Sequence, residues 1–157
     1  MKKDVRKFFT LIICLTIVYS FALIGSIFTS TNVNTEWYSS IKPSITPPSW
    51  VFPVVWNILF FLIALSLFLA WTKSNKEQKI KITILFGINL ILNVFWSFSF
   101  FFLKNPLLAF IDLILLGISI IAIMIFVKKI DKKSAFFILP YFLWICFAGI
   151  LNFLIAF

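Results

Sequence analysis

The sequence has no histidine and little cysteine: two cysteines among 157 residues. Histidine is the commonest metal ligand in proteins and the usual axial ligand of haem, so its absence argues against ligated haem. Cys14 and Cys146 both lie inside apolar runs. This placement gives little support to a disulfide or a zinc site. We therefore predict no metal and no cofactor.

Charged residues are also scarce. They make up 12% of the chain, 62% is hydrophobic and the mean hydropathy is +1.11, whereas a soluble domain has roughly a quarter charged residues. The net charge of +9 would favour nucleic acid in a soluble protein. Here the basic residues form short clusters between apolar runs, so we predict the lipid bilayer as partner and no nucleic acid.

Five apolar runs are long enough to cross about 30 Å of hydrocarbon as helices. They cover residues 8–29, 49–71, 80–103, 106–127 and 134–157. The first is too long for the apolar region of a signal peptide, and runs such as 118–127 lack the alternation of β-barrel strands. We predict an all-α membrane protein, a five-transmembrane-helix bundle that forms a single domain over residues 1–157.

Basic clusters occur in the N-terminal tail and in the second and fourth connections between the apolar runs. Each contains four basic residues and one acidic residue, a net charge of +3. They lie at residues 2–7, 73–81 and 128–133. The first connection between runs has only Glu36 and Lys42, and the third only Lys104. Because Lys and Arg stay on the cytoplasmic side, we predict a multi-pass protein of the cell membrane with a cytoplasmic N-terminus and the C-terminus outside.

The only long connection covers residues 30–48 and lies on the predicted outer side. Trp37 and Tyr38 are typical of the aromatic belt at a membrane interface. Pro47 and Pro48 fix φ and lack backbone donors, which predicts a stiff, extended chain. One interpretation is simply the start of the second helix beneath an interfacial loop; the other is a lid across the mouth of the bundle.

Polar and indole side chains concentrate in the outer half of the predicted bundle. A rise of about 1.5 Å per residue places six of them in the outer half of the membrane, beneath the long loop. These are Trp56, Asn93, Trp96, Asp112, Trp144 and Asn152. Polar groups are costly in lipid unless they are paired, and indole N–H groups seek partners. The concentration predicts a pocket with an aromatic lining, opening under the lid.

Some of these residues have a purely structural alternative. Asn89, Asn93 and Asn152 are also consistent with hydrogen bonds between helices, which contribute about 0.6 kcal/mol each. Asp112 is consistent either with a structural carboxylate that accepts bonds from loop amides or an Asn, or with a ligand-facing role. These alternatives stay open at the level of the sequence.

Several segments resemble one family of membrane proteins. They are Trp37-Tyr38, Lys42-Pro43, Thr46-Pro47-Pro48, the run 50–56, the run 89–97 with Asn93 and Trp96, the run 109–112 and the run 140–152. Their order and content are similar to the translocator-protein family, the group of tryptophan-rich sensory proteins and peripheral benzodiazepine receptors. The resemblance covers essentially the whole chain.

The resemblance implies a homodimeric five-helix bundle that holds a hydrophobic ligand below the first loop. Ligands of the family include porphyrins such as protoporphyrin IX, isoquinoline carboxamides and benzodiazepines. Together with the depth argument, it defines the predicted ligand-binding residues. They are Tyr38, Pro47, Phe52, Trp56, Phe60, Asn93, Trp96, Ser97, Asp112, Trp144, Ala148 and Leu151.

Three functions are compatible with these residues. The first is a membrane receptor or carrier for porphyrins and other flat hydrophobic ligands. The second is a protein that degrades porphyrins with light and oxygen, with Trp56 and Trp144 as reactive partners. The third is a structural membrane subunit without a ligand. No acid–base pair or activated nucleophile supports ordinary hydrolysis or group transfer.

Overall fold

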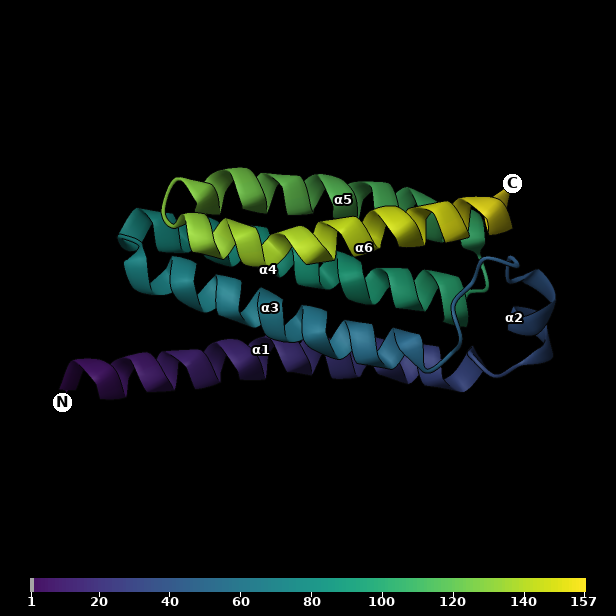
Figure 1. Cartoon of the computed structure of the whole chain (residues 1–157), viewed down its shortest axis with the longest axis horizontal. Helices are drawn as coiled ribbons and strands as arrows, with labels where there is room; N and C mark the ends of the chain where they lie inside the picture. The colour runs from purple at the N-terminus through teal and green to yellow at the C-terminus, as the bar shows by residue number, and fades with distance from the viewer. Residues whose placement is uncertain (1) are drawn as a thin grey trace.

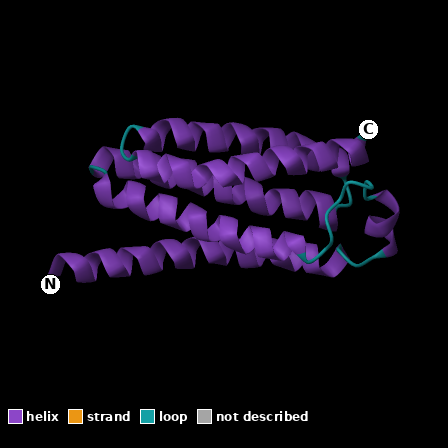
Figure 2. Ribbon diagram, in the orientation of Figure 1, coloured by secondary structure: helices purple, strands orange, loops and turns teal. Residues whose placement is uncertain are grey.

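The computed structural model describes the backbone of residues 2–157 and the side chains of residues 4–157. Over these residues it consists of helices joined by loops, without a strand (Figure 2). The elements are α1 (Lys2–Asn32), α2 (Glu36–Ile41), α3 (Val51–Lys73), α4 (Lys76–Ser97), a π-helix η1 (Phe98–Phe102), α5 (Pro106–Lys128) and α6 (Lys132–Ala156).

Five of these helices are long and apolar enough to cross a membrane, with η1 continuing α4. Their most apolar windows have mean hydropathies of 1.8–2.9. They run roughly parallel to one long axis, and the two chain ends lie at opposite ends of the bundle (Figure 1). The predicted all-α bundle with five spans is confirmed.

Helix caps determine where the spans begin and end. Asn75 and Gln78 form a reciprocal capping box at the start of α4, with N···O distances of 3.0 and 2.9 Å. At the start of α5, the Asn105 side chain accepts from Leu108 N at 3.0 Å, and Pro106 occupies the first turn. Such caps satisfy backbone donors that would otherwise be unpaired. The connections before α4 and α5 are short, and each joins two antiparallel helices.

The long connection differs from the prediction. Helix α1 continues to Asn32, and the short helix α2 lies inside the connection that we expected to be a loop. A helix of this length is not stable alone. It is stabilised by packing on η1: the rings of Trp37 and Phe100 are 5.8 Å apart, and those of Tyr38 and Phe101 5.6 Å.

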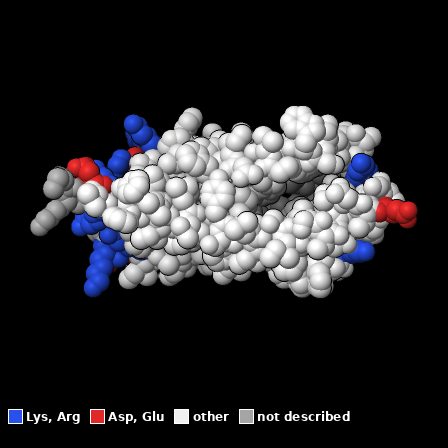
Figure 3. Space-filling view, turned by 90° about the horizontal axis from the view of Figure 1, so that it is seen from below, with Lys and Arg blue, Asp and Glu red and all other residues white. Residues whose placement is uncertain are grey.

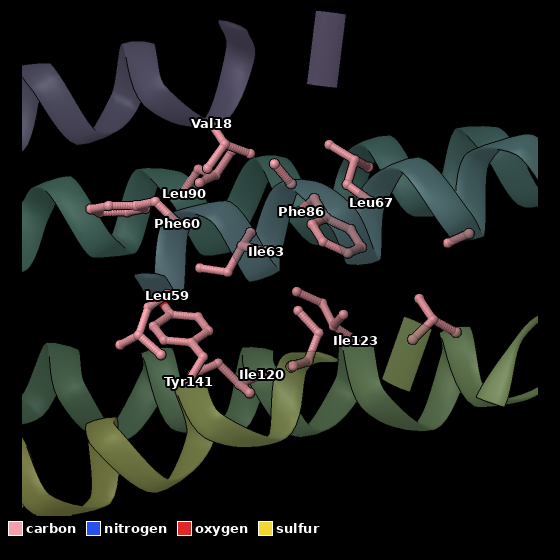
Figure 4. Packing of buried hydrophobic residues seen from close by; sticks show 14 of the residues in the cluster. Val18, Leu59, Phe60, Ile63, Leu67, Phe86, Leu90, Ile120, Ile123 and Tyr141 are labelled. Atoms are coloured by element: carbon pink, nitrogen blue, oxygen red, sulfur yellow. The ribbon is translucent and has the colours of Figure 1, made fainter. Parts of the chain in front are cut away.

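The half of the bundle nearer the start of α1 has an apolar core. Figure 4 shows Ile63, Phe86, Ile120 and Ile123 meeting between the helices. The buried hydroxyls of Ser66 and Ser134 bond to each other there at 2.9 Å. Buried amides and indoles thus lie mainly in the other half.

Charged residues follow the same axis. Lys and Arg side chains gather at the end where α1 begins, and few charges appear at the α2 end (Figure 3). All three basic clusters of the sequence therefore belong to one end of the molecule, as the orientation prediction requires.

Candidate ligand cavity

A cavity of about 700 Å³ lies in the half of the bundle beneath α2. Small-molecule pockets typically measure about 300–1,000 Å³. All five long helices contribute to its walls, and the 30–50 connection contributes its roof. The void is thus large enough for a drug-sized or larger guest.

Eleven of the twelve predicted site residues line this cavity, and Asp112 does not. The eleven are Tyr38, Pro47, Phe52, Trp56, Phe60, Asn93, Trp96, Ser97, Trp144, Ala148 and Leu151. They come from α2, the loop, α3, α4 and α6.

Aromatic rings form two of the walls. On α3, Trp56 stacks on Phe60 with centroids 5.2 Å apart and an interplanar angle of 28°. On the facing α6, the Trp144 ring meets Phe52 edge-on at 5.9 Å. Offset and edge-on contacts of this kind are the favoured arrangements of aromatic pairs. They hold the ring faces in fixed positions around the void.

Amides beside the cavity connect the helices. Asn93 Nδ2 donates to the Tyr141 hydroxyl at 3.1 Å, joining α4 to α6. Trp96 Nε1 donates to Asn152 Oδ1 at 3.1 Å, and Asn152 Nδ2 donates to the carbonyl of Pro106 at 2.8 Å. Below them, Asn89 Nδ2 donates to Ser119 Oγ at 2.8 Å. The three asparagines therefore do form hydrogen bonds between helices, and Asn93 and Asn152 also line the cavity.

Two buried polar atoms on the cavity lining lack a partner among the described residues. They are the indole Nε1 of Trp144 in α6 and the hydroxyl Oγ1 of Thr46 in the roof. A buried unpaired donor normally costs about 1–3 kcal/mol. Both atoms have less than 1 Å² of accessible area, so a guest could pair with either one only after the side chain shifts.

The roof adds one cation and one phenol. Lys42 is the only charged residue among those that line the cavity in the described part of the chain. Partial burial raises the pKa of the Tyr38 phenol, so this hydroxyl stays neutral at neutral pH. A carboxylate at the mouth would find both a positive charge and a hydrogen-bond donor.

Asp112 fits neither of the two roles expected for it. Its side chain on α5 is 2% exposed, and neither carboxylate oxygen has a hydrogen-bond partner within residues 4–157. It does not line the cavity, and none of the loop amides or asparagines in the described part of the chain donates to it. Depth along a helix follows from counting residues, but the direction in which the side chain points depends on packing.

The wall formed by α1 was not among the predicted site residues. Its lining residues include Tyr19, Ala22, Ser26, Thr29 and Val33, which recur every three or four positions and share one helix face. This stripe of small and polar residues is visible in the sequence. The sequence alone does not say that the stripe faces the other indole-bearing helices.

Fold and site together define a multi-pass membrane protein whose helix bundle encloses a cavity large enough for a small molecule. Residues 12–157 match the TspO/MBR family, and the chain belongs to that family. The predicted resemblance is confirmed.

Its relatives come from bacteria, archaea and animals. It is 34% identical to the tryptophan-rich protein TspO of Chlorobaculum tepidum, over 96% of both chains. It is 39% identical to the tryptophan-rich protein TspO of Archaeoglobus fulgidus, over 88% of this chain and 89% of the relative. It is also 30% identical to the translocator protein of Ovis aries, over 75% and 72%.

Proposed function

We propose that this protein is a membrane receptor or carrier that binds free-base porphyrins such as protoporphyrin IX, and other flat hydrophobic molecules. The observation that carries the proposal is a cavity of about 700 Å³ with aromatic walls that include Trp56 and Trp144. Ring faces such as Trp56 stack on flat macrocycles. Lys42 at the mouth matches the propionates of a porphyrin.

Titration of protoporphyrin IX into the protein in nanodiscs tests this proposal, with the Soret absorbance of the pigment as readout. We expect saturable binding that Trp144→Ala weakens about tenfold, or about 1.4 kcal/mol. Trp71→Ala is the matched control, because Trp71 lies outside the cavity lining, under the ammonium of Lys79. Absence of saturation, or equal affinity of the Trp144 and Trp71 variants, contradicts the proposal.

A second candidate is porphyrin degradation driven by light and oxygen. Two indoles, Trp56 and Trp144, line the same cavity, and Trp56 is edge-on to Tyr141 with centroids 6.2 Å apart. In this reaction oxygen is the oxidant and the macrocycle is oxidised. The test is illumination of the complex in air: bleaching must exceed that of free pigment, stop without oxygen, and fall in Trp56→Phe or Trp144→Phe but not in Trp71→Phe.

A purely structural subunit has no need of such a cavity, so we do not favour it. We also propose that the protein is located in the cell membrane, on the basis of its charge pattern. From the family resemblance we propose that it assembles as a homodimer. The mass of the protein–nanodisc complex distinguishes one copy from two.

A further inference from the structure

The cavity has a side opening between α1 and α3. Residues that line the cavity and are also exposed mark the edge of an opening. On α1 these are Leu23, Ser26 and Ser30; on α3 they are Pro53 and Asn57. Figure 3, which views the bundle from the side of α1 and α3, shows a hollow in the half away from the basic clusters.

Both edges belong to helices that are long and apolar enough to cross a membrane, so a bilayer around these helices would meet the opening. Its polar side chains are compatible with that surrounding. Ser26 Oγ donates to the Leu23 carbonyl at 2.7 Å, and Asn57 Nδ2 donates to the Pro53 carbonyl at 2.9 Å. Ser30 is bonded in the same way to its own helix. Donors that are satisfied within their own helix add little cost next to acyl chains.

The opening has a defined lower limit. The Tyr19 hydroxyl donates to the Asn57 carbonyl at 3.1 Å, and the Tyr19 ring lies 6.4 Å from that of Phe60. These contacts join α1 to α3 below the hollow. Behind it, α1 is closed against α4, where Gly25 lies against Val94 and Ser97.

The part of the roof formed by α2 is packed, whereas the exposed lining residues Asn34, Lys42, Ser49 and Trp50 continue the edge of the opening into the loop. Trp37 and Tyr38 of α2 rest on Phe100 and Phe101, and the Lys104 ammonium lies 5.6 Å from the Trp37 ring centroid. A guest that came from water beneath α2 would have to displace this aromatic cluster. A guest dissolved in the bilayer meets the edges of α1 and α3 instead.

We propose that the cavity exchanges its ligand with the membrane leaflet on the α2 side, through the opening between α1 and α3. The proposal rests on the proposed binding function for its biological meaning. It also defines the ligand class as molecules that partition into a bilayer before they bind.

A thiol placed inside the cavity tests the route without any natural ligand. In a Cys14→Ala, Cys146→Ala background, Ala148→Cys puts a thiol on the α6 wall. N-(1-pyrenyl)maleimide dissolved in the nanodisc bilayer should modify it. Ser26→Trp should slow this modification at least about tenfold, as expected for a blocked access step.

Ile27→Trp is the matched control, since Ile27 is the next residue, is 61% exposed and does not line the cavity. It should leave the rate unchanged. Thermal unfolding of each variant checks that the bundle is intact. Equal rates in the Ser26→Trp and Ile27→Trp variants overturn the proposal, and so does modification by a charged, water-soluble methanethiosulfonate as fast as by the lipophilic maleimide.

A second measurement separates this proposal from the proposed function. Association of protoporphyrin IX should be slower in Ser26→Trp than in Ile27→Trp. If no variant binds the pigment while the thiol rates behave as expected, the binding function is wrong and the side opening stands. If the pigment binds at equal rates in both, exchange through the opening is wrong.

Discussion

At the residue scale, the least satisfied group of the bundle is Asp112. Both its carboxylate oxygens are buried without a partner in the described part of the chain. An uncompensated carboxylate inside a membrane span is costly. We expect Asp112→Asn, a neutral side chain of the same shape, to raise the free energy of unfolding by about 1 kcal/mol or more, as measured by thermal unfolding in detergent.

The control for this prediction is Asp112→Ala, which removes the charge but also leaves a void. Its free energy of unfolding should therefore rise less than that of Asp112→Asn. Because Asp112 does not line the cavity, ligand affinity should stay within about twofold in Asp112→Asn, a shift well below the tenfold step of about 1.4 kcal/mol. A loss of stability in Asp112→Asn means that the carboxylate has a role that its surroundings do not reveal.

Unlike Asp112, Asn152 has hydrogen-bond partners for both the oxygen and the nitrogen of its side-chain amide. Its Oδ1 accepts from Trp96 and its Nδ2 donates to the Pro106 carbonyl. Asn152→Leu leaves the indole N–H of Trp96 without that acceptor, so we expect a loss of about 1–2 kcal/mol in the free energy of unfolding. Phe153→Leu, at the exposed neighbouring position, should change it little.

At the element scale, α2 depends on its neighbours. It has six residues, too few to form a helix in isolation, and its contacts with η1 replace the missing intrinsic stability. We expect Trp37→Ala to increase amide hydrogen exchange throughout Glu36–Ile41. Ser39→Ala, at an exposed position on the same helix, should leave that exchange unchanged. Equal protection in both variants would mean that α2 is held by something other than the Trp37–Phe100 contact.

Features that depend only on the local sequence could be predicted, whereas features that depend on contacts between distant segments could not. The five spans follow from the length of apolar runs, because lipid forces each backbone segment to satisfy itself within one helix. The indoles and amides of α3, α4 and α6 were predicted to converge because depth along the helices places them in the same half of the bundle. Helix α2, the π-helix η1 and the α1 wall depend on contacts between distant segments, which no local pattern contains.

At the scale of the whole molecule, the charge distribution and the cavity together define an orientation. The basic clusters lie at one end (Figure 3), and α2 with the cavity roof lies at the other (Figure 1). Lys and Arg clusters favour the cytoplasmic side. Ser44 in the roof loop and Lys76 at the start of α4 are both exposed and lie in connections at opposite ends. We expect Ser44→Cys to react with a membrane-impermeant maleimide in intact cells, and Lys76→Cys to react only after lysis.

Both variants are made in the Cys14→Ala, Cys146→Ala background, because the native Cys146 is exposed. The labelling pattern has a consequence for the cavity. If Ser44→Cys is the reactive variant, the side opening between α1 and α3 lies in the outer leaflet, and ligands added outside reach it without crossing the bilayer. If only Lys76→Cys reacts in intact cells, the positive-inside prediction is wrong, and the opening exchanges with the inner leaflet instead.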